Sequence, residues 1–160
     1  AYEIRNCDWS SDVCSSDLRY LLVSTAGEHG RAARWREPDG TWVFRESLNL
    51  RGQVSETDAR LVSGADGMPT GLVIRGATPQ GNAAETYVRD GKTGRWKSPF
   101  DAGSVDDVRG RYYVSAGGPG LLGADFYERL FAAPGRQLRL LPGGEARMEQ
   151  LDATTVGVAL

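Results

Sequence analysis

His29 is the first residue to consider for chemistry, because it is the single histidine of the chain. It lies in the segment Gly27-Glu28-His29-Gly30, whose composition is typical of a turn. A hydrolytic base needs a nucleophile within hydrogen-bond reach and a third group that orients it. Glu28 directly precedes His29, and neighbouring side chains in a turn rarely face each other. The sequence therefore predicts a solvated turn histidine, and we assign no catalytic residue.

Metal-ligating residues are few. Besides His29, the chain has only carboxylates and two cysteines, Cys7 and Cys14. Asp101, Asp106 and Asp107 share a loop but lack the alternating spacing of an EF-hand calcium site. A zinc site needs three or four well-placed nitrogen, sulfur or oxygen ligands. We therefore predict that the chain itself binds no metal and no cofactor, and that these acids are surface residues.

The glycine-rich segment Gly117-Gly118-Pro119-Gly120 precedes an expected helix, and helix N-termini bind anions. The segment lacks the Gly-Lys-Ser/Thr ending of a phosphate-binding loop, and Pro119 removes one backbone donor. We interpret it as a flexible connection. Glu46 interrupts the apolar alternation of its expected strand, which indicates either a functional lining or a bulge.

Aromatic residues are the best candidates for binding. In a curved sheet with one buried face, such side chains are either core residues or the lining of an apolar groove. If the sheet binds a ligand, we expect the site to be formed by Trp42, Phe44, Tyr87 and Trp96.

Residues 1–18 resemble something other than a protein segment. From Cys7 to Leu18 they match a translation of a common short-read sequencing adapter, Ala1 to Ile4 fit its flanking sequence, and Arg5 and Asn6 fit the variable index between the two parts. A small disulfide loop or half of a metal site are the alternatives for Cys7 and Cys14. We expect residues 1–18 to be an artefact outside the fold, and residues 19–160 to be one β-rich domain truncated at both ends.

Composition excludes several classes of protein. Residues 1–18 hold one basic and four acidic residues, so the remainder carries 18 basic and 17 acidic residues. A nearly neutral chain gives no support for nucleic-acid binding, which depends on a clustered basic surface. No apolar run is long enough to form a transmembrane helix.

Turn residues divide the chain into short strands. Asp-Gly pairs, which favour hairpin turns, recur at Asp39-Gly40, Asp66-Gly67 and Asp90-Gly91. Residues 99–110 are expected to form a loop. The expected strands, several of them joined as hairpins, are Tyr20–Ser24, Ala32–Glu37, Thr41–Leu50, Gln53–Val62, Gly71–Gly76, Ala84–Arg89, Gly94–Ser98, Arg111–Ser115, Gln137–Leu141 and Ala146–Leu151.

One helix is expected over Leu121–Ala132, where Leu122, Phe126 and Leu130 recur at helical spacing. The expected fold is all-β with this single helix. It is a strongly curved antiparallel meander, forming one open half-barrel sheet with the helix packed on one face.

The order of several short motifs resembles the β-rich region that precedes the metal-dependent barrel in bacterial amidohydrolase-superfamily proteins. The resemblance covers residues 20–151. Its motifs are Leu50-Arg51-Gly52-Gln53, Ala65-Asp66-Gly67-Met68-Pro69, Ile74-Arg75-Gly76-Ala77-Thr78, Glu85-Thr86-Tyr87, Trp96-Lys97-Ser98, Tyr112-Tyr113-Val114 and Leu140-Leu141-Pro142-Gly143-Gly144-Glu145-Ala146. Gln53 stands where the family pattern has proline.

The resemblance implies an exported, periplasmic or secreted parent hydrolase whose metal ligands, including a His-x-His pair, lie on a barrel. None of those ligands can be assigned to this chain. We therefore expect a non-catalytic accessory domain whose partner is a C-terminal barrel. The alternative is a stand-alone periplasmic module that holds an apolar small ligand in its curved sheet. Neither hypothesis involves nucleic acid or a transmembrane segment.

Overall fold

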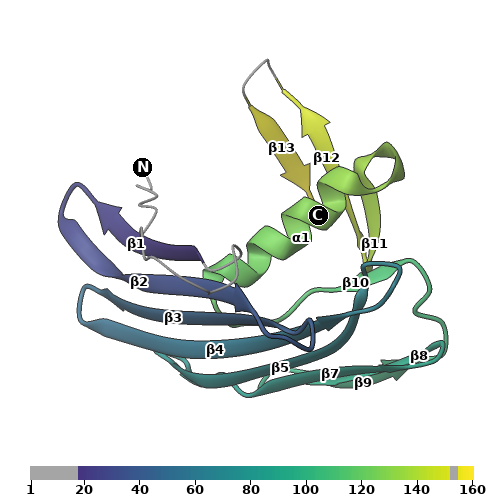
Figure 1. Ribbon diagram of the computed structural model, residues 1–160, viewed down its shortest axis with the longest axis horizontal. Coiled ribbons are helices and arrows are strands. Elements are labelled where there is room, and N and C mark those ends of the chain that lie inside the picture. The colour runs from purple at the N-terminus through teal and green to yellow at the C-terminus, as the bar shows by residue number, and fades with distance from the viewer. Residues whose placement is uncertain (1–17, 152–154) are drawn as a thin grey trace.

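The computed structural model describes residues 18–151 and 155–160, and consists mainly of β-strands with a single α-helix (Figure 1). Most of the expected strands are present. The strands are β1 (Leu18–Ser24), β2 (Gly27–Arg36), β3 (Trp42–Leu50), β4 (Gln53–Ser63), β5 (Pro69–Thr78), β6 (Gly81–Asn82), β7 (Glu85–Asp90), β8 (Thr93–Lys97), β9 (Ala102–Val105), β10 (Arg111–Tyr113), β11 (Gln137–Leu141), β12 (Glu145–Gln150) and β13 (Val156–Ala159). The helix α1 spans Gly120–Ala132, and a 3-10 turn covers Pro134–Arg136.

The predicted turns form the hairpins. Between β2 and β3, Gly40 adopts a φ of 87°, and the Asp39 carboxylate accepts a hydrogen bond from the Thr41 amide at 2.9 Å. Gly67 and Gly91 also have positive φ, at 74° and 59°. A residue with a Cβ is strained at such angles, whereas glycine is not. The local turn chemistry therefore sets the hairpin positions that the sequence predicted.

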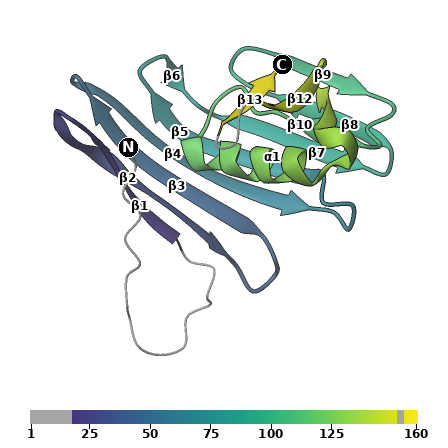
Figure 2. The ribbon, with the colours of Figure 1, turned by 90° about the horizontal axis from the view of Figure 1, so that it is seen from above.

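The large sheet contains nine strands, all antiparallel, in the order β1-β2-β3-β4-β5-β7-β8-β9, with β6 paired to β5. It is strongly curved and does not close into a barrel (Figures 1 and 2). The predicted open, curved antiparallel meander is therefore confirmed. The expectation of a loop over residues 99–110 was wrong in part, because β9 pairs with β8 and extends the sheet by one strand.

The expectation of a single sheet was also wrong. Strands β10, β11, β12 and β13 form a second sheet, and β10 runs parallel to β11. A parallel pair needs a long crossover between its strands, and α1 supplies it. The last predicted hairpin is present as β11 and β12. After α1, however, the chain enters β11, which pairs with β10 and not with a strand of the large sheet.

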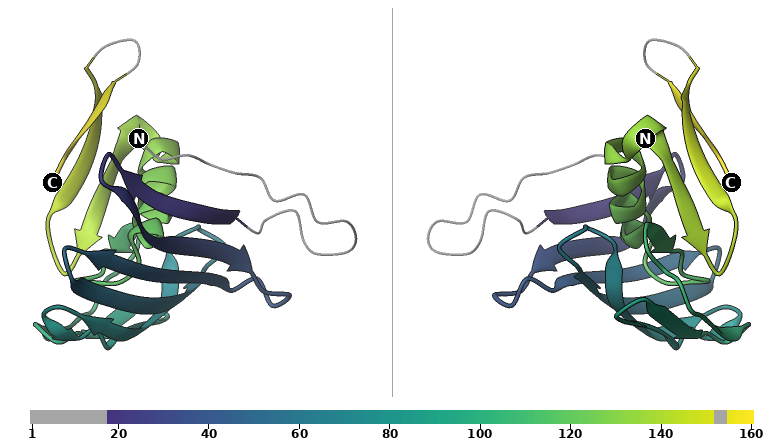
Figure 3. Two further views of the ribbon diagram at one scale, coloured as in Figure 1. Left: turned by 90° about the vertical axis from the view of Figure 1, so that its left-hand side faces the viewer. Right: turned by 90° about the vertical axis from the view of Figure 1, so that its right-hand side faces the viewer.

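The helix lies over the concave side of the large sheet, and the second sheet packs against the helix (Figures 1 and 3). Its buried residues include Leu122, Phe126 and Leu130, as the helical spacing predicted. Leu122 belongs to the core cluster of the large sheet. Phe126 and Leu130 belong to a second cluster with Tyr112, Leu138, Leu140 and Ala146. The helix therefore joins two adjoining cores.

The expectation that Leu18 lies outside the fold was wrong. Leu18, the last residue assigned to the adapter-like segment, is the first residue of β1 and pairs with Arg34 of β2. Residues 1–17 lie outside the described part of the chain. Among the described residues, no helix has the length and apolarity needed to cross a bilayer.

Candidate functional site

The four predicted ligand-binding residues come together on the concave side of the large sheet. Phe44 and Tyr87 are each 1% exposed and belong to the main core cluster. Trp42 and Trp96 are half-buried and pack against the edge of the same cluster. The sequence therefore placed all four on one face correctly, and the structure shows how much of that face is covered.

Tyr113 covers the centre of this aromatic group. Its ring is stacked on Tyr87, with centroids 4.4 Å apart and an interplanar angle of 4°. Trp96 lies beside Tyr113 in a tilted arrangement, with centroids 6.3 Å apart. Leu122 from α1 and Leu141 from β11 complete the layer. The inner face of the sheet is therefore filled by side chains of the chain itself.

A buried carboxyl group lies beside the aromatic stack. Glu85 is 1% exposed, and its Oε1 accepts a hydrogen bond from the Tyr113 hydroxyl at 2.8 Å. The amides of Ala116 and Gly117 also donate to it, at 3.0 Å and 3.3 Å. Burial raises the pKa of Glu85, and these hydrogen bonds only partly oppose the rise. Glu85 therefore fastens the segment before α1 to the large sheet.

A second buried acid belongs to the second core. Asp125, on α1, is 3% exposed and accepts a hydrogen bond from the Tyr112 hydroxyl at 2.8 Å. Arg129 lies 3.9 Å away, one helical turn further on. Burial raises the pKa of Asp125 despite these two partners. Adjacent tyrosines of β10 thus hold two separate acids, one on each side of the strand.

His29 is not the solvated turn residue that the sequence predicted. It lies in β2, is half-buried, and its Nε2 is 2.6 Å from the Oγ of Ser24. The strand register shifts between Leu22 and Val23, so His29 is the extra residue of a β-bulge, and such bulges redirect side chains. Ser24 Oγ also accepts a hydrogen bond from the Ala26 amide at 3.1 Å.

This serine–histidine pair is incomplete as a nucleophilic site. The adjacent acid, Glu28, is engaged by the guanidinium of Arg31 at 3.1 Å. Within the described residues no carboxylate hydrogen bonds to the second nitrogen of His29. A nucleophilic serine also needs amide donors directed at the developing oxyanion, and the neighbouring Ala26 amide already donates to Ser24 Oγ itself.

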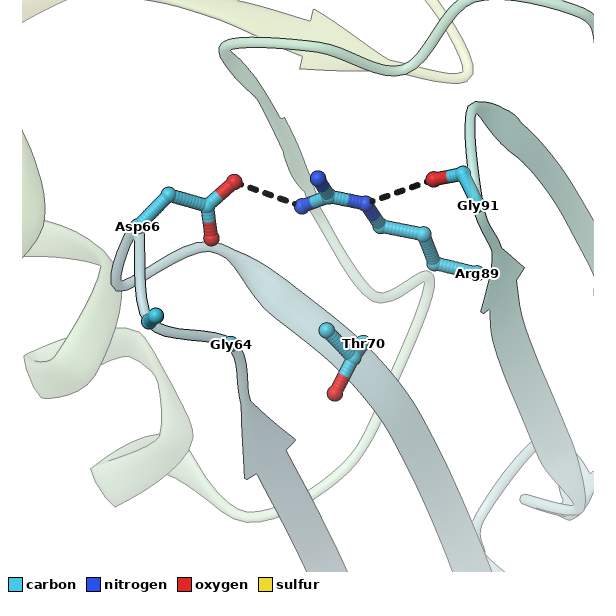
Figure 4. A pocket seen from close by; sticks show the side chains of 6 residues that line it. Gly64, Asp66, Thr70, Arg89 and Gly91 are labelled. Carbon is cyan, nitrogen blue, oxygen red and sulfur yellow. Dashed lines mark hydrogen bonds and ion pairs between the residues drawn. The ribbon is translucent and has the colours of Figure 1, made fainter.

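An open pocket of about 330 Å³ lies at the end of the large sheet, where the β4–β5 and β7–β8 turns meet (Figure 4). Arg89 crosses it, donating to Asp66 at 2.7 Å and to the Gly91 carbonyl at 3.2 Å. Burial disfavours the Asp66 carboxylate, but the hydrogen bonds from Arg89 and Met68 lower its pKa overall. The two charges neutralise each other, so the pocket has no net charge to attract an ion.

The loop acids, predicted to be surface residues, have individual roles in the loop. Asp101 accepts a hydrogen bond from the indole nitrogen of Trp96 at 3.0 Å, and Asp107 pairs with Arg109 at 2.9 Å. The hydrogen bonds and charge of Arg109 hold the pKa of Asp107 well below its usual range. In residues 18–151 and 155–160, no three metal-ligating side chains gather in one place.

Two contacts of the segment before α1 were not predicted from the sequence. Glu46 does not mark a bulge, because the registers on both sides of β3 are regular there, and its carboxylate accepts a hydrogen bond from the Gly120 amide at 3.0 Å. The segment 117–120, interpreted as a flexible connection, is held at Gly117, whose amide donates to Glu85 at 3.3 Å. The sequence did carry a signal for both contacts, because Glu46 and Glu85 are acidic residues at inward-facing positions of their strands.

Fold and site together define an open antiparallel β-sheet domain whose concave face is covered by its own helix and a small second sheet. No family model matches the chain, and no curated protein or solved structure is significantly similar to it.

Proposed function

We propose that this chain is a non-catalytic accessory β-domain of an exported, amidohydrolase-like metal-dependent hydrolase. The observation that carries the proposal is the filled concave face, where Tyr113 stacks on Tyr87 and both rings are at most 3% exposed. Because the chain's own side chains fill this face, the face offers no room for a ligand. This favours a domain that acts by packing against another domain.

The alternative, an apolar ligand in the curved sheet, requires room beside Trp42, Phe44, Tyr87 and Trp96. Such a ligand would have to displace Tyr113 and break its hydrogen bond to the buried Glu85 carboxyl group. Leaving a buried polar group without its partner costs about 1–3 kcal/mol. The filled face therefore favours the accessory role over a stand-alone binding module.

The chemistry of the described side chains agrees with a non-catalytic role. Activation of water by a metal at neutral pH requires about three protein ligands around an open coordination position. The described chain offers His29 in a bond to Ser24, and scattered acids that have partners of their own. In the proposed hydrolase, the ligands come from the barrel that the motif resemblance implies.

Reading the source gene beyond Leu160 tests this proposal. We expect the reading frame to continue into a segment with the alternating strands and helices of a barrel and with a His-x-His pair. A stop codon shortly after Leu160 would contradict the accessory role and favour the stand-alone module.

A further inference from the structure

We propose that Asp90-Gly91, in the turn between β7 and β8, is a site of spontaneous covalent modification, where the Asp90 side chain closes a succinimide ring on the Gly91 nitrogen and reopens to isoaspartate. The described residues contain three Asp-Gly pairs, which are Asp39-Gly40, Asp66-Gly67 and Asp90-Gly91. All three lie at turns of the large sheet, so the dipeptide alone does not distinguish them. The proposal does not rest on the proposed function, because it concerns the chemistry of turn residues of this chain.

The modification needs no reagent other than water. The Gly91 nitrogen attacks Cγ of Asp90, and the carboxyl hydroxyl leaves with the amide proton as water. Water then adds to one of the two ring carbonyls. Addition at Cγ restores aspartate, whereas addition at the main-chain carbonyl breaks its bond to nitrogen and leaves the chain running through Cβ and Cγ of an isoaspartate. Ring closure therefore requires a carboxyl group that is free to turn toward the next residue and an amide nitrogen that is free of other contacts.

The carboxyl group is free at Asp90 and held at the other two pairs. Asp39 and Asp66 each accept a hydrogen bond from the amide two residues further on, at 2.9 Å and 3.1 Å. Arg89 also donates to Asp66, at 2.7 Å (Figure 4). Asp90 is exposed and forms no hydrogen bond or ion pair with another described residue. Side-chain hydrogen bonds of this local kind fix the carboxylate of an aspartate in a turn, and Asp90 lacks them.

The amide nitrogens differ in the same way. The Gly40 amide donates to the Glu37 carbonyl at 2.8 Å, and the Gly67 amide donates to the Gly64 carbonyl at 2.9 Å. The Gly91 amide donates to no other described residue. Attack by Gly40 or Gly67 therefore requires a turn hydrogen bond to break first, whereas attack by Gly91 does not.

The surroundings of the three glycines also favour Gly91. A side chain at Gly67 would meet the guanidinium of Arg129 at 3.0 Å, and one at Gly40 would meet that of Arg36 at 3.5 Å. A side chain at Gly91 would have no atom within 4 Å. The space beside Gly91 is thus open, so the ring can form there without displacing a neighbour.

An isoaspartate at this position alters the end of the large sheet. Asp90 pairs with Thr93 across a turn of only two residues, and the modification adds Cβ of Asp90 to the main chain of that turn. The Gly91 carbonyl, which accepts a hydrogen bond from Arg89 at 3.2 Å, lies directly beyond the altered bond. The same hairpin carries Tyr87 of the main core, so the modification is expected to lower stability.

Ageing the purified 160-residue chain in neutral buffer tests the proposal. Chymotryptic peptides are analysed by mass spectrometry, in which succinimide appears as the loss of one water and isoaspartate is identified by electron-based fragmentation. We expect isoaspartate to accumulate several-fold faster at Asp90 than at Asp39 or Asp66 in the folded chain. In concentrated urea we expect similar rates at all three, because unfolding frees every carboxyl group and every amide.

Equal rates at the three pairs in the folded chain, or a faster reaction at Asp39 or Asp66, would overturn the proposal. Preference for Asp90 that persists unchanged in urea would overturn it as well, since the fold would then not select the site. Asp90→Glu is the matched variant, because glutamate must close a larger ring and reacts far more slowly. We expect the aged wild type to unfold at lower urea concentration than the aged variant. An equal loss in both would contradict the assignment of the damage to this turn.

Discussion

The ring of Tyr113 lies parallel to that of Tyr87, with centroids 4.4 Å apart, and this contact joins the second sheet to the large one. The Tyr113 hydroxyl continues the connection by donating to the buried carboxyl group of Glu85. Stacking and hydrogen bonding by one side chain therefore close the concave face and fix the segment that leads into α1.

The Glu85 contact predicts an energetic coupling. We expect Tyr113→Phe and Glu85→Gln to be non-additive, with a coupling energy of about 0.5–3 kcal/mol in a double-mutant cycle. Tyr112→Phe is the matched control, because Tyr112 donates to Asp125 and shares no partner with Glu85. Its effect is expected to add to that of Glu85→Gln within about 0.5 kcal/mol. Urea denaturation measures each free energy of unfolding, and equal coupling in both cycles would contradict the assignment.

The raised pKa of Glu85 predicts a pH dependence of unusual sign for a carboxyl group. Its pKa in the folded chain lies above the ordinary value of 4.5 because of burial, so the folded state holds the proton more tightly than the unfolded state. The contribution of Glu85 to stability is therefore greatest below pH 4.5 and falls as the pH rises toward the folded pKa.

Comparison with Glu85→Gln isolates this effect from the other acids. Unfolding free energies are measured for both proteins from about pH 4 to about pH 7. We expect the difference, wild type minus variant, to decrease across this range. A difference that grows with pH would mean that the folded state favours the charged form.

Because α1 lies between two cores, truncating its buried residue Leu130 is predicted to lower the free energy of unfolding strongly. This residue is fully buried in the second cluster, so we expect Leu130→Ala to lower the free energy of unfolding by about 2–5 kcal/mol. Phe131 is 58% exposed, and the guanidinium of Arg136 lies over its ring, 4.8 Å from the centroid. Phe131→Ala is therefore expected to cost less than about 1 kcal/mol. Similar losses for both would show that the helix does not cover the core as described.

The filled concave face predicts weak or absent binding of apolar ligands. Titration with a fluorescent fatty acid is expected to leave the tryptophan emission of Trp42 and Trp96 unchanged, because Tyr113 and Leu122 occupy the inner face. The variant Trp42→Phe is the control, because it shows whether any change in emission comes from the indole of Trp42. Saturable binding that loses its emission change in Trp42→Phe would instead favour the ligand-binding module.

The parts of the fold that the sequence predicted well are those set by local chemistry. Asp-Gly pairs determined hairpin positions, and the spacing of Leu122, Phe126 and Leu130 located the helix and its buried face. The division into two sheets was missed, since it depends on β10 pairing with β11 across the length of the helix. That choice is made by long-range packing, which no short pattern encodes.

The candidate site divides in the same way. Alternation placed Trp42, Phe44, Tyr87 and Trp96 on one face, but it did not show that Tyr113 would cover them. The Ser24–His29 bond was missed because it requires a β-bulge, and the register of a hairpin with a short, irregular turn is not visible in composition.

Metal-dependent amide hydrolysis by the purified chain tests the accessory role most directly. The chain is assayed with added zinc beside the longer protein encoded by the gene, and Ser24→Ala and His29→Ala are included because these side chains form the one nucleophile–base contact in the described residues. We expect activity in the longer protein and none in the 160-residue chain or its variants. Zinc-dependent hydrolysis by the chain alone, abolished by His29→Ala, would contradict the account.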